Sequence, residues 1–330
     1  MEKPNSFQSQ IYTVNEATFG NIALSVFRYQ ALYNPVYSEY IKALGIKLQE
    51  VNAVHEIPFL PIDFFKTHPV KTGNWNEETI FTSSGTTGTA ASSHHICDAS
   101  FYHNNARLCF EYFFGSLTDH YFLALLPSYL ERSNSSLVSM IRYFIELSGL
   151  QGSGFYLNNF TQLVDDVMKL QDEGKRKIVV WGVSFALLDL AEKVAPDFSN
   201  CLVFETGGMK GRRREITREE LHQALKQGLH VERIFSEYGM TELLSQAYTG
   251  GGARFKCPPW MRVMARDMTD PLQVGQQNKT GGLNVIDLAN IHTAAFIETA
   301  DMGIVFEDGS FEVLGRLDNA EIRGCNLLVE

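Results

Sequence analysis

The chain has 330 residues, of which 45% are hydrophobic and 20% charged, and its formal net charge at pH 7 is −10. This is a globular composition, long enough for one large domain or two smaller ones. The acidic balance argues against a nucleic-acid partner, which requires a basic surface. No apolar run is long enough for a membrane span, and residues 1–6 do not resemble a signal peptide.

The five cysteines are widely spaced and include no C-x-x-C pair. Neither a disulfide framework nor a zinc site is indicated by this pattern. We therefore expect a cytoplasmic protein in a reducing compartment.

The N-terminal region is predicted to be a helical layer. Residues 11–53 carry apolar side chains at helical spacing, which is typical of packing helices. Two prolines in Ile57–Lys66 exclude a regular helix there, so we expect an extended apolar edge against the core. We assign residues 1–75 to this layer.

A loop of small residues, Thr82–Thr89, lies between a β-prone run at 79–81 and a helical pattern at 99–114. Glycines permit close backbone approach, and successive N–H groups and hydroxyls can surround an anionic oxygen. The loop is thus a candidate phosphate cradle, with a solvated turn as the alternative. It matches neither a Walker A loop nor a G-x-G-x-x-G loop. The candidate residues are Ser83, Ser84, Gly85, Thr86, Thr87 and Gly88.

Buried strands are predicted at 121–126, 178–183 and 201–205, alternating with helices at 137–147, 160–173 and 186–194. Loops at the C-terminal ends of such strands are where an open α/β sheet binds ligands. On this ground Arg132 is predicted to face an anion, with a plain loop as the alternative. Trp181, Gly182 and Ser184 are predicted to line a substrate pocket, with a tight strand–helix turn as the alternative for the last two.

Four further segments carry candidate ligand-binding residues. Gly207 and Gly208 follow the third strand, and two glycines let the backbone lie against a flat ligand. Residues 237–242 read Glu-Tyr-Gly-Met-Thr-Glu, and residues 299–301 read Thr-Ala-Asp. Residues 315–318, Gly-Arg-Leu-Asp, are predicted to form a turn.

In this order, the segments resemble the signatures of the adenylate-forming enzymes, the superfamily of acyl-CoA synthetases and luciferases. The loop matches Ser/Thr-Ser-Gly-Ser/Thr-Thr-Gly up to Thr89, but Ala90 and Ala91 stand where Pro-Lys is usual. Tyr-Gly-x-Thr-Glu matches completely, Thr-Gly-Asp has Ala300 for glycine, and Gly-Arg-x-Asp/Lys matches at Arg316. The resemblance implies an α/β fold, the adenylate-forming N-terminal domain, with mixed sheets flanked by helices.

The resemblance also implies ATP and Mg²⁺ as cofactors. Glu242 would supply a hard oxygen ligand for Mg²⁺, and Thr241 would donate to the α-phosphate; both would be catalytic. Asp301 would accept hydrogen bonds from the ribose, and Arg316 would reach ribose or phosphate. The adenine would lie near Gly207, Gly208, Tyr238, Gly239 and Met240.

One branch, the LuxE-type acyl-protein synthetases, shares the stretch Pro-x-x-Phe-Phe-Lys before the loop and a cysteine near the C-terminus, here Cys325. This likeness implies ATP-dependent activation of a fatty acid to acyl-AMP and acyl transfer to the Cys325 thiol. We expect residues 76–316 to form the adenylate-forming core and residues 317–330 to be a short tail, with the mobile C-terminal lid domain absent.

Other functions stay open. One is a phenylacetate-type acyl- or aryl-CoA ligase, and another is acyl transfer to a carrier protein or to a polysaccharide or lipid acceptor. A third is a non-catalytic nucleotide-binding subunit, which the missing Pro-Lys pair permits. The expected partners are a small carboxylic acid and an acyl-donor or acyl-acceptor protein, and an oligomer is compatible with the sequence.

Overall fold

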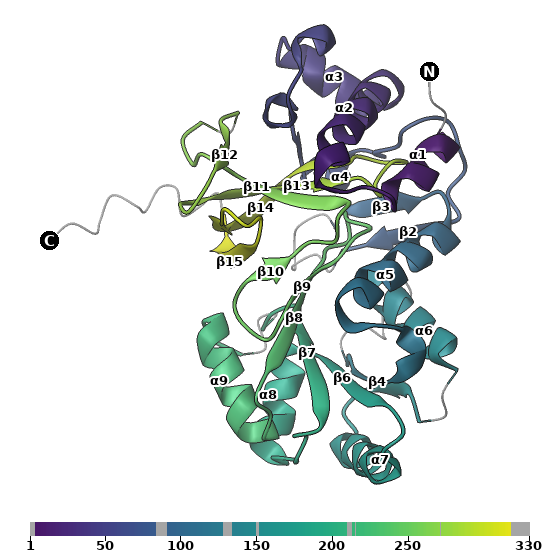
Figure 1. Ribbon diagram of the computed structural model, residues 1–330, viewed down its shortest axis with the longest axis vertical. Helices are drawn as coiled ribbons and strands as arrows, with labels where there is room; N and C mark the ends of the chain where they lie inside the picture. Colours follow the sequence, from purple (N-terminus) through teal and green to yellow (C-terminus); the bar gives the residue numbers. More distant parts are fainter. Residues whose placement is uncertain are drawn as a thin grey trace, which may run out of the picture. The chain divides into compact units, whose positions relative to one another are not determined.

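The computed structural model describes residues 4–83, 91–127, 134–149, 152–209, 213–214, 216–270 and 272–317. The chain divides into two compact units (Figure 1). No helix in the described ranges is long and apolar enough to cross a membrane. The functional boundaries predicted at residues 75 and 316 stay predictions. Unit 1 contains Met1–Ala99, Glu242–Ser245 and Lys256–Glu330, and unit 2 contains Ser100–Thr241 and Gln246–Phe255.

Helices open unit 1, as the spacing of apolar residues predicts. The Asn15 side chain accepts hydrogen bonds from the N–H groups of Ala17 and Thr18 and so starts the longest of them. Asn34 ends that helix and caps the next one, which has proline at its first turn. The helices are α1 (Pro4–Ile11), α2 (Glu16–Tyr33), α3 (Pro35–Ala43) and α4 (Phe64–Thr67), with short 3-10 turns η1 (Leu48–Glu50) and η2 (Val54–Glu56).

An antiparallel sheet forms the rest of the unit 1 core. Its strand order is β12-β11-β13-β14-β15, and β1 (Leu60–Pro61) pairs in parallel with β14. Phe296 of β14 contacts Phe27, Tyr37 and Phe59, which places α2 and α3 against the sheet. The strands are β11 (Met261–Arg266), β12 (Val274–Gln276), β13 (Thr280–Asp287), β14 (Phe296–Val305) and β15 (Phe311–Arg316), and a separate hairpin joins β2 (Thr79–Thr82) to β3 (Ser93–Ile96).

Two local predictions for unit 1 need correction. The Ile57–Lys66 segment is extended only at its centre, because the helix α4 begins at Phe64, just after the second proline. Arg316 is the last residue of strand β15 and does not lie in a turn. A cross-strand pairing with β14 holds it in the sheet, and this pairing is invisible in the local sequence.

Unit 2 is a mostly parallel sheet with helices on both faces (Figure 1). The order is β9-β8-β7-β6-β4-β5, with only β9 antiparallel. Phe110 of α5 contacts Phe122 and Phe204 of the sheet, and α8 and α9 pack together on the opposite face. The strands are β4 (His120–Leu125), β5 (Gly154–Tyr156), β6 (Lys177–Val183), β7 (Cys201–Thr206), β8 (Ile234–Tyr238) and β9 (Ala247–Thr249); the helices are α5 (Ala99–Phe114), α6 (Ser136–Ser148), α7 (Phe160–Glu173), α8 (Ser184–Lys193) and α9 (Arg218–Leu229).

The register of the parallel strands determines which loops meet in unit 2. Leu125 pairs with Gly182, Gly182 with Glu205, and Glu205 with Ser236. The C-terminal ends of β4, β6, β7 and β8 therefore lie at one edge of the sheet. This is the edge at which open α/β sheets bind their ligands.

Candidate functional site

In unit 1 the structure brings together Glu242, Asp301 and Arg316. Asp301 and Arg316 are direct partners on β14 and β15, and the Arg316 Nε lies 3.8 Å from the Asp301 Oδ1. Glu242 is 5% exposed. Burial raises the pKa of its carboxyl, and the negative charge of Asp301 raises it further. A hydrogen bond from Ser92 and the positive charge of Arg316 act in the opposite direction and lower this pKa, but burial outweighs them. Three residues from three sequence signatures thus form one charged cluster.

Buried hydrogen bonds fix the chain around Glu242. The Asn290 side-chain amide donates to the Glu242 carbonyl at 2.8 Å. The Asp287 carboxylate, at the end of β13, accepts from the N–H groups of Leu244 and Ser245 at 2.9 and 2.8 Å. It also accepts from the Ser245 hydroxyl at 2.6 Å. The residues that follow Glu242 are therefore tied to the end of a core strand.

A buried arginine supports the strand that carries Asp301. The Arg266 guanidinium donates to the carbonyl groups of Leu283 and Thr299 at 3.1 and 2.8 Å. The Thr299 hydroxyl in turn accepts from the Asp301 N–H at 3.1 Å. No local sequence signal indicates this role, because Arg266 meets Leu283 and Thr299 only across neighbouring strands.

The candidate phosphate loop begins at the end of a closed hairpin. Ser83 exchanges hydrogen bonds with Ser92: its hydroxyl accepts from the Ser92 N–H at 2.8 Å, and its N–H donates to the Ser92 carbonyl at 3.0 Å. The other predicted loop residues, Ser84, Gly85, Thr86, Thr87 and Gly88, lie outside the described residues, as do Arg132 and Cys325.

In unit 2 the predicted adenine-binding residues follow two neighbouring strands. Gly207 comes directly after β7 and has a φ of +77°, a conformation that favours glycine. Gly208, next in the chain, has open space where a Cβ would lie. Tyr238 ends β8, is 8% exposed and packs on Phe255, with ring centroids 5.7 Å apart. A Cβ on Gly239 would collide with the Glu237 carboxylate, so a larger residue there would require the Glu237 side chain to move. Met240 and Thr241 follow and are half-buried.

A buried polar network underlies these loops on the face covered by α8 and α9. The Glu205 carboxylate, 3% exposed, accepts hydrogen bonds from Ser184 and Ser236 at 2.9 and 2.6 Å. His222 and Arg218 of α9 lie 3.5 and 3.7 Å from it. Burial raises the pKa of Glu205, but these partners outweigh burial and lower it overall. The network ties β7, β8, α8 and α9 together, and no local sequence signal reveals it.

The predicted pocket residues of unit 2 take part in packing. Trp181 is fully buried and stacks on Phe204 with ring centroids 4.7 Å apart. A Cβ on Gly182 would lie 2.6 Å from the Leu187 side chain, in agreement with the tight strand–helix turn. The Ser184 hydroxyl is engaged by Glu205. A role for the three in substrate binding stays a prediction.

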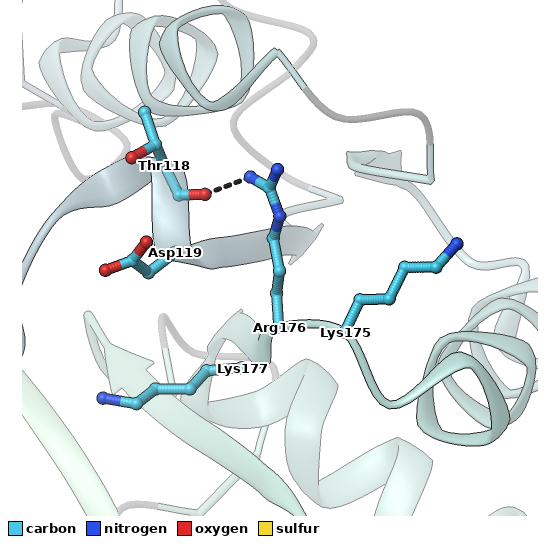
Figure 2. A pocket seen from close by; sticks show the side chains of 5 residues that line it. All are labelled: Thr118, Asp119, Lys175, Arg176 and Lys177. Atoms are coloured by element: carbon cyan, nitrogen blue, oxygen red, sulfur yellow. Dashed lines mark hydrogen bonds between the residues drawn. The ribbon is translucent and has the colours of Figure 1, made fainter.

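A surface hollow of about 420 Å³ lies elsewhere in unit 2. Figure 2 shows the side chains that line it. Lys175, Arg176 and Lys177 line it, and the Arg176 guanidinium donates to the Thr118 carbonyl. Thr118 precedes β4, and Lys177 is the first residue of β6, so the hollow lies at the N-terminal edge of the sheet. It is separate from the edge where Gly207 and Tyr238 lie.

No protein-family model and no curated protein matches the chain. Solved structures do. A 2-hydroxyisobutyryl-CoA ligase in complex with 2-HIB-AMP and CoA is 13% identical, with a TM-score of 0.69 over 94% of this chain and 71% of that one. The open conformation of that ligase is 12% identical, with a TM-score of 0.67 over 94% of this chain and 78% of that one. ATP-bound MatB from Rhodopseudomonas palustris is 14% identical, with a TM-score of 0.53 over 74% of this chain and 49% of that one.

These neighbours are adenylate-forming ligases, and the likeness covers most of this chain. It confirms the predicted fold: a mixed α/β architecture with a large sheet flanked by helices, as in the N-terminal domain of adenylate-forming enzymes. At this level of identity the likeness concerns the fold alone.

Proposed function

We propose that the protein activates a carboxylic acid with ATP to form an acyl-adenylate. The observation that carries the proposal is the unit 1 cluster of Glu242, Asp301 and Arg316. These residues come from three separate signatures of adenylate-forming enzymes, and they gather on a chain with that fold. The complexes of the ligase neighbour with 2-HIB-AMP give the proposal further support.

In the proposed reaction, a carboxylate oxygen of the acid attacks the α-phosphorus of ATP. The bond to the β,γ-pyrophosphate breaks, and the acyl-adenylate and pyrophosphate form. Catalysis of such a step rests on positioning and on stabilising the charge of the phosphoryl oxygens. The loop 82–89 and the Thr241 hydroxyl would bind phosphate oxygens, and Asp301 would accept hydrogen bonds from the ribose. Arg316 would hold Asp301 in place and contact ribose or phosphate.

Mg²⁺ fits the residues present. It is commonly held by one or two carboxylates together with substrate phosphates and water, and Glu242 offers such a carboxylate with Asp301 nearby. Among the described residues, no group of three or more His, Cys, Asp or Glu could hold a metal alone. A cation at Glu242 would offset the burial that raises the pKa of this carboxyl. When bound, Mg²⁺ would neutralise phosphate charge.

For the second half-reaction we propose acyl transfer to a thiol, with Cys325 as the acceptor, as in the LuxE-type enzymes that the sequence resembles. In this step the sulfur attacks the acyl carbon and AMP leaves. CoA is the competing acceptor, and it is favoured by the CoA complexes of the ligase neighbour, which cover 94% of this chain. A fatty acid as substrate also stays a proposal.

The test is acid-dependent exchange of pyrophosphate into ATP, measured across a panel of fatty, aryl and amino acids. We expect exchange in the wild type and in Cys325→Ala, and a large loss in Glu242→Gln. A hydroxylamine-sensitive acyl label on the wild type and on Cys97→Ala, but not on Cys325→Ala, would assign the acceptor.

Equal labelling of all variants would remove Cys325 from the mechanism. AMP release only with CoA would identify a CoA ligase. ATP binding without exchange for any acid would contradict the proposed function and indicate a nucleotide-binding subunit.

A further inference from the structure

Three polar side chains gather at the C-terminal edge of the unit 2 sheet, on the face that α5 covers. Glu237 of β8 and Tyr248 of β9 are direct cross-strand partners, so their side chains leave the same face of the sheet. The Thr206 hydroxyl, at the end of β7, donates to the Glu237 Oε2 at 2.5 Å. We call Thr206, Glu237 and Tyr248 the polar trio.

The Tyr248 hydroxyl is buried and has no hydrogen-bond partner among the residues that the structure describes. The residue is 1% exposed, and its ring packs on Phe113 and Phe114 of α5, with centroids 5.7 and 5.4 Å away. By contrast, the neighbouring Tyr102 hydroxyl donates to the Ser136 carbonyl at 2.9 Å. A buried hydroxyl without a hydrogen-bond partner is energetically unfavourable, so such a group indicates a ligand that forms the missing hydrogen bond.

Glu237, the cross-strand partner of Tyr248, presents a second polar group on the same face of the sheet. Its Oε2 is held by Thr206, and its Oε1 lies against the main chain at Gly239, where a Cβ would collide with it. Burial and the nearby Glu205 raise the pKa of this carboxyl to about 7. Near neutral pH the group therefore exists in both forms and can accept or donate a proton in a hydrogen bond.

We propose that the acid activated by this protein carries a hydroxyl or amino substituent, and that the Tyr248 hydroxyl and the Glu237 carboxyl bind this substituent. The inference rests on the proposed function and narrows its substrate class. A hydroxyl can accept from Tyr248 and donate to Glu237 at once, and an amine can donate to Glu237. An unsubstituted alkyl chain would leave both groups unpaired, and sites built around such groups discriminate strongly against analogues that lack the partner.

The experiment compares acids of equal chain length with and without a hydroxyl or amino substituent, in pyrophosphate exchange. We expect the wild type to prefer the substituted acid at least tenfold in kcat/KM. Tyr248→Phe should lose most of this preference through a higher KM for the substituted acid. The matched control is Tyr156→Phe, whose hydroxyl donates to Asp166 at 2.7 Å at the other end of the sheet order; it should retain the preference.

A thermal melt distinguishes this role from a structural one. Since the Tyr248 hydroxyl has no hydrogen-bond partner in the described part of the chain, Tyr248→Phe should melt no lower than the wild type. Tyr156→Phe, which loses a hydrogen bond to Asp166, should melt lower. Two results would overturn the inference and leave the proposed function intact. One is exchange in the wild type that is as fast with plain acids as with substituted ones, and the other is an unchanged preference in Tyr248→Phe. No exchange with any acid would overturn both.

Discussion

Glu237 gives the most direct test of the electrostatics in unit 2. Burial beside Glu205 raises the pKa of its carboxyl from 4.5 to about 7 in the folded protein. Between these values the unfolded chain releases a proton that the folded chain keeps. The stabilisation is therefore full below pH 4.5 and is lost as pH rises through 7. At 1.36 kcal/mol per pKa unit, this rise corresponds to roughly 3 kcal/mol in the free energy of unfolding. Because the Glu237 side chain is partly exposed, we expect an effect of about 2 kcal/mol.

The substitution is Glu237→Gln, which keeps an acceptor for the Thr206 hydroxyl and removes the titration. The free energy of unfolding is measured in urea at several pH values from 5 to 8. We expect the wild type to lose about 2 kcal/mol relative to the variant across this range. Because all other titrating groups are shared, the difference between the two curves isolates Glu237. Parallel curves would refute the reasoning and would show a carboxyl that is ionised and solvated throughout.

Three further substitutions test other parts of the structure. Asp287→Asn turns an amide N–H₂ group toward two of the donors that bind the carboxylate, and each lost hydrogen bond should lower the free energy of unfolding by about 1.5–3 kcal/mol. Calorimetry should show a lower Tm, and the exchange assay should show a slower reaction. Gly228→Ala places a Cβ 2.6 Å from the Ala191 Cβ where α8 meets α9, so the free energy of unfolding in urea should fall by about 1–3 kcal/mol; no change would contradict the close packing. Arg316→Ala removes an exposed ion pair with Asp301, so unfolding should change by less than about 1 kcal/mol while the KM for ATP rises; an unchanged KM would exclude Arg316 from nucleotide binding.

Much of the fold could be predicted because the local patterns agree with the tertiary structure. The helix predicted at 160–173 is observed at Phe160–Glu173, where Asn159 caps the start and Gly174 takes up a left-handed conformation at the end. The apolar run predicted at 178–183 lies within the buried strand β6 (Lys177–Val183), in the middle of a parallel sheet.

The candidate site was only partly predictable. Glu242 and Asp301 belong to short motifs, so their importance was visible in the sequence, and the structure adds that they lie near each other. The Glu205 network and the polar trio were not visible, because their members meet only through strand register. Thr206, Glu237 and Tyr248 come from three strands, and no local pattern encodes the pairing of Glu237 with Tyr248. The position of Arg316 in β15 was missed for the same reason.

The central claim is that the carboxylate of the acid attacks the α-phosphorus of ATP. The most direct measurement follows the oxygen atoms: an acid labelled with ¹⁸O in its carboxylate is incubated with the protein, ATP, Mg²⁺ and a thiol acceptor, and the AMP is examined by mass spectrometry. Our account predicts one ¹⁸O atom in the AMP, because the bridging oxygen of the acyl-adenylate stays with phosphorus when the acyl group leaves. Unlabelled AMP, or ADP and phosphate as the products, would contradict it.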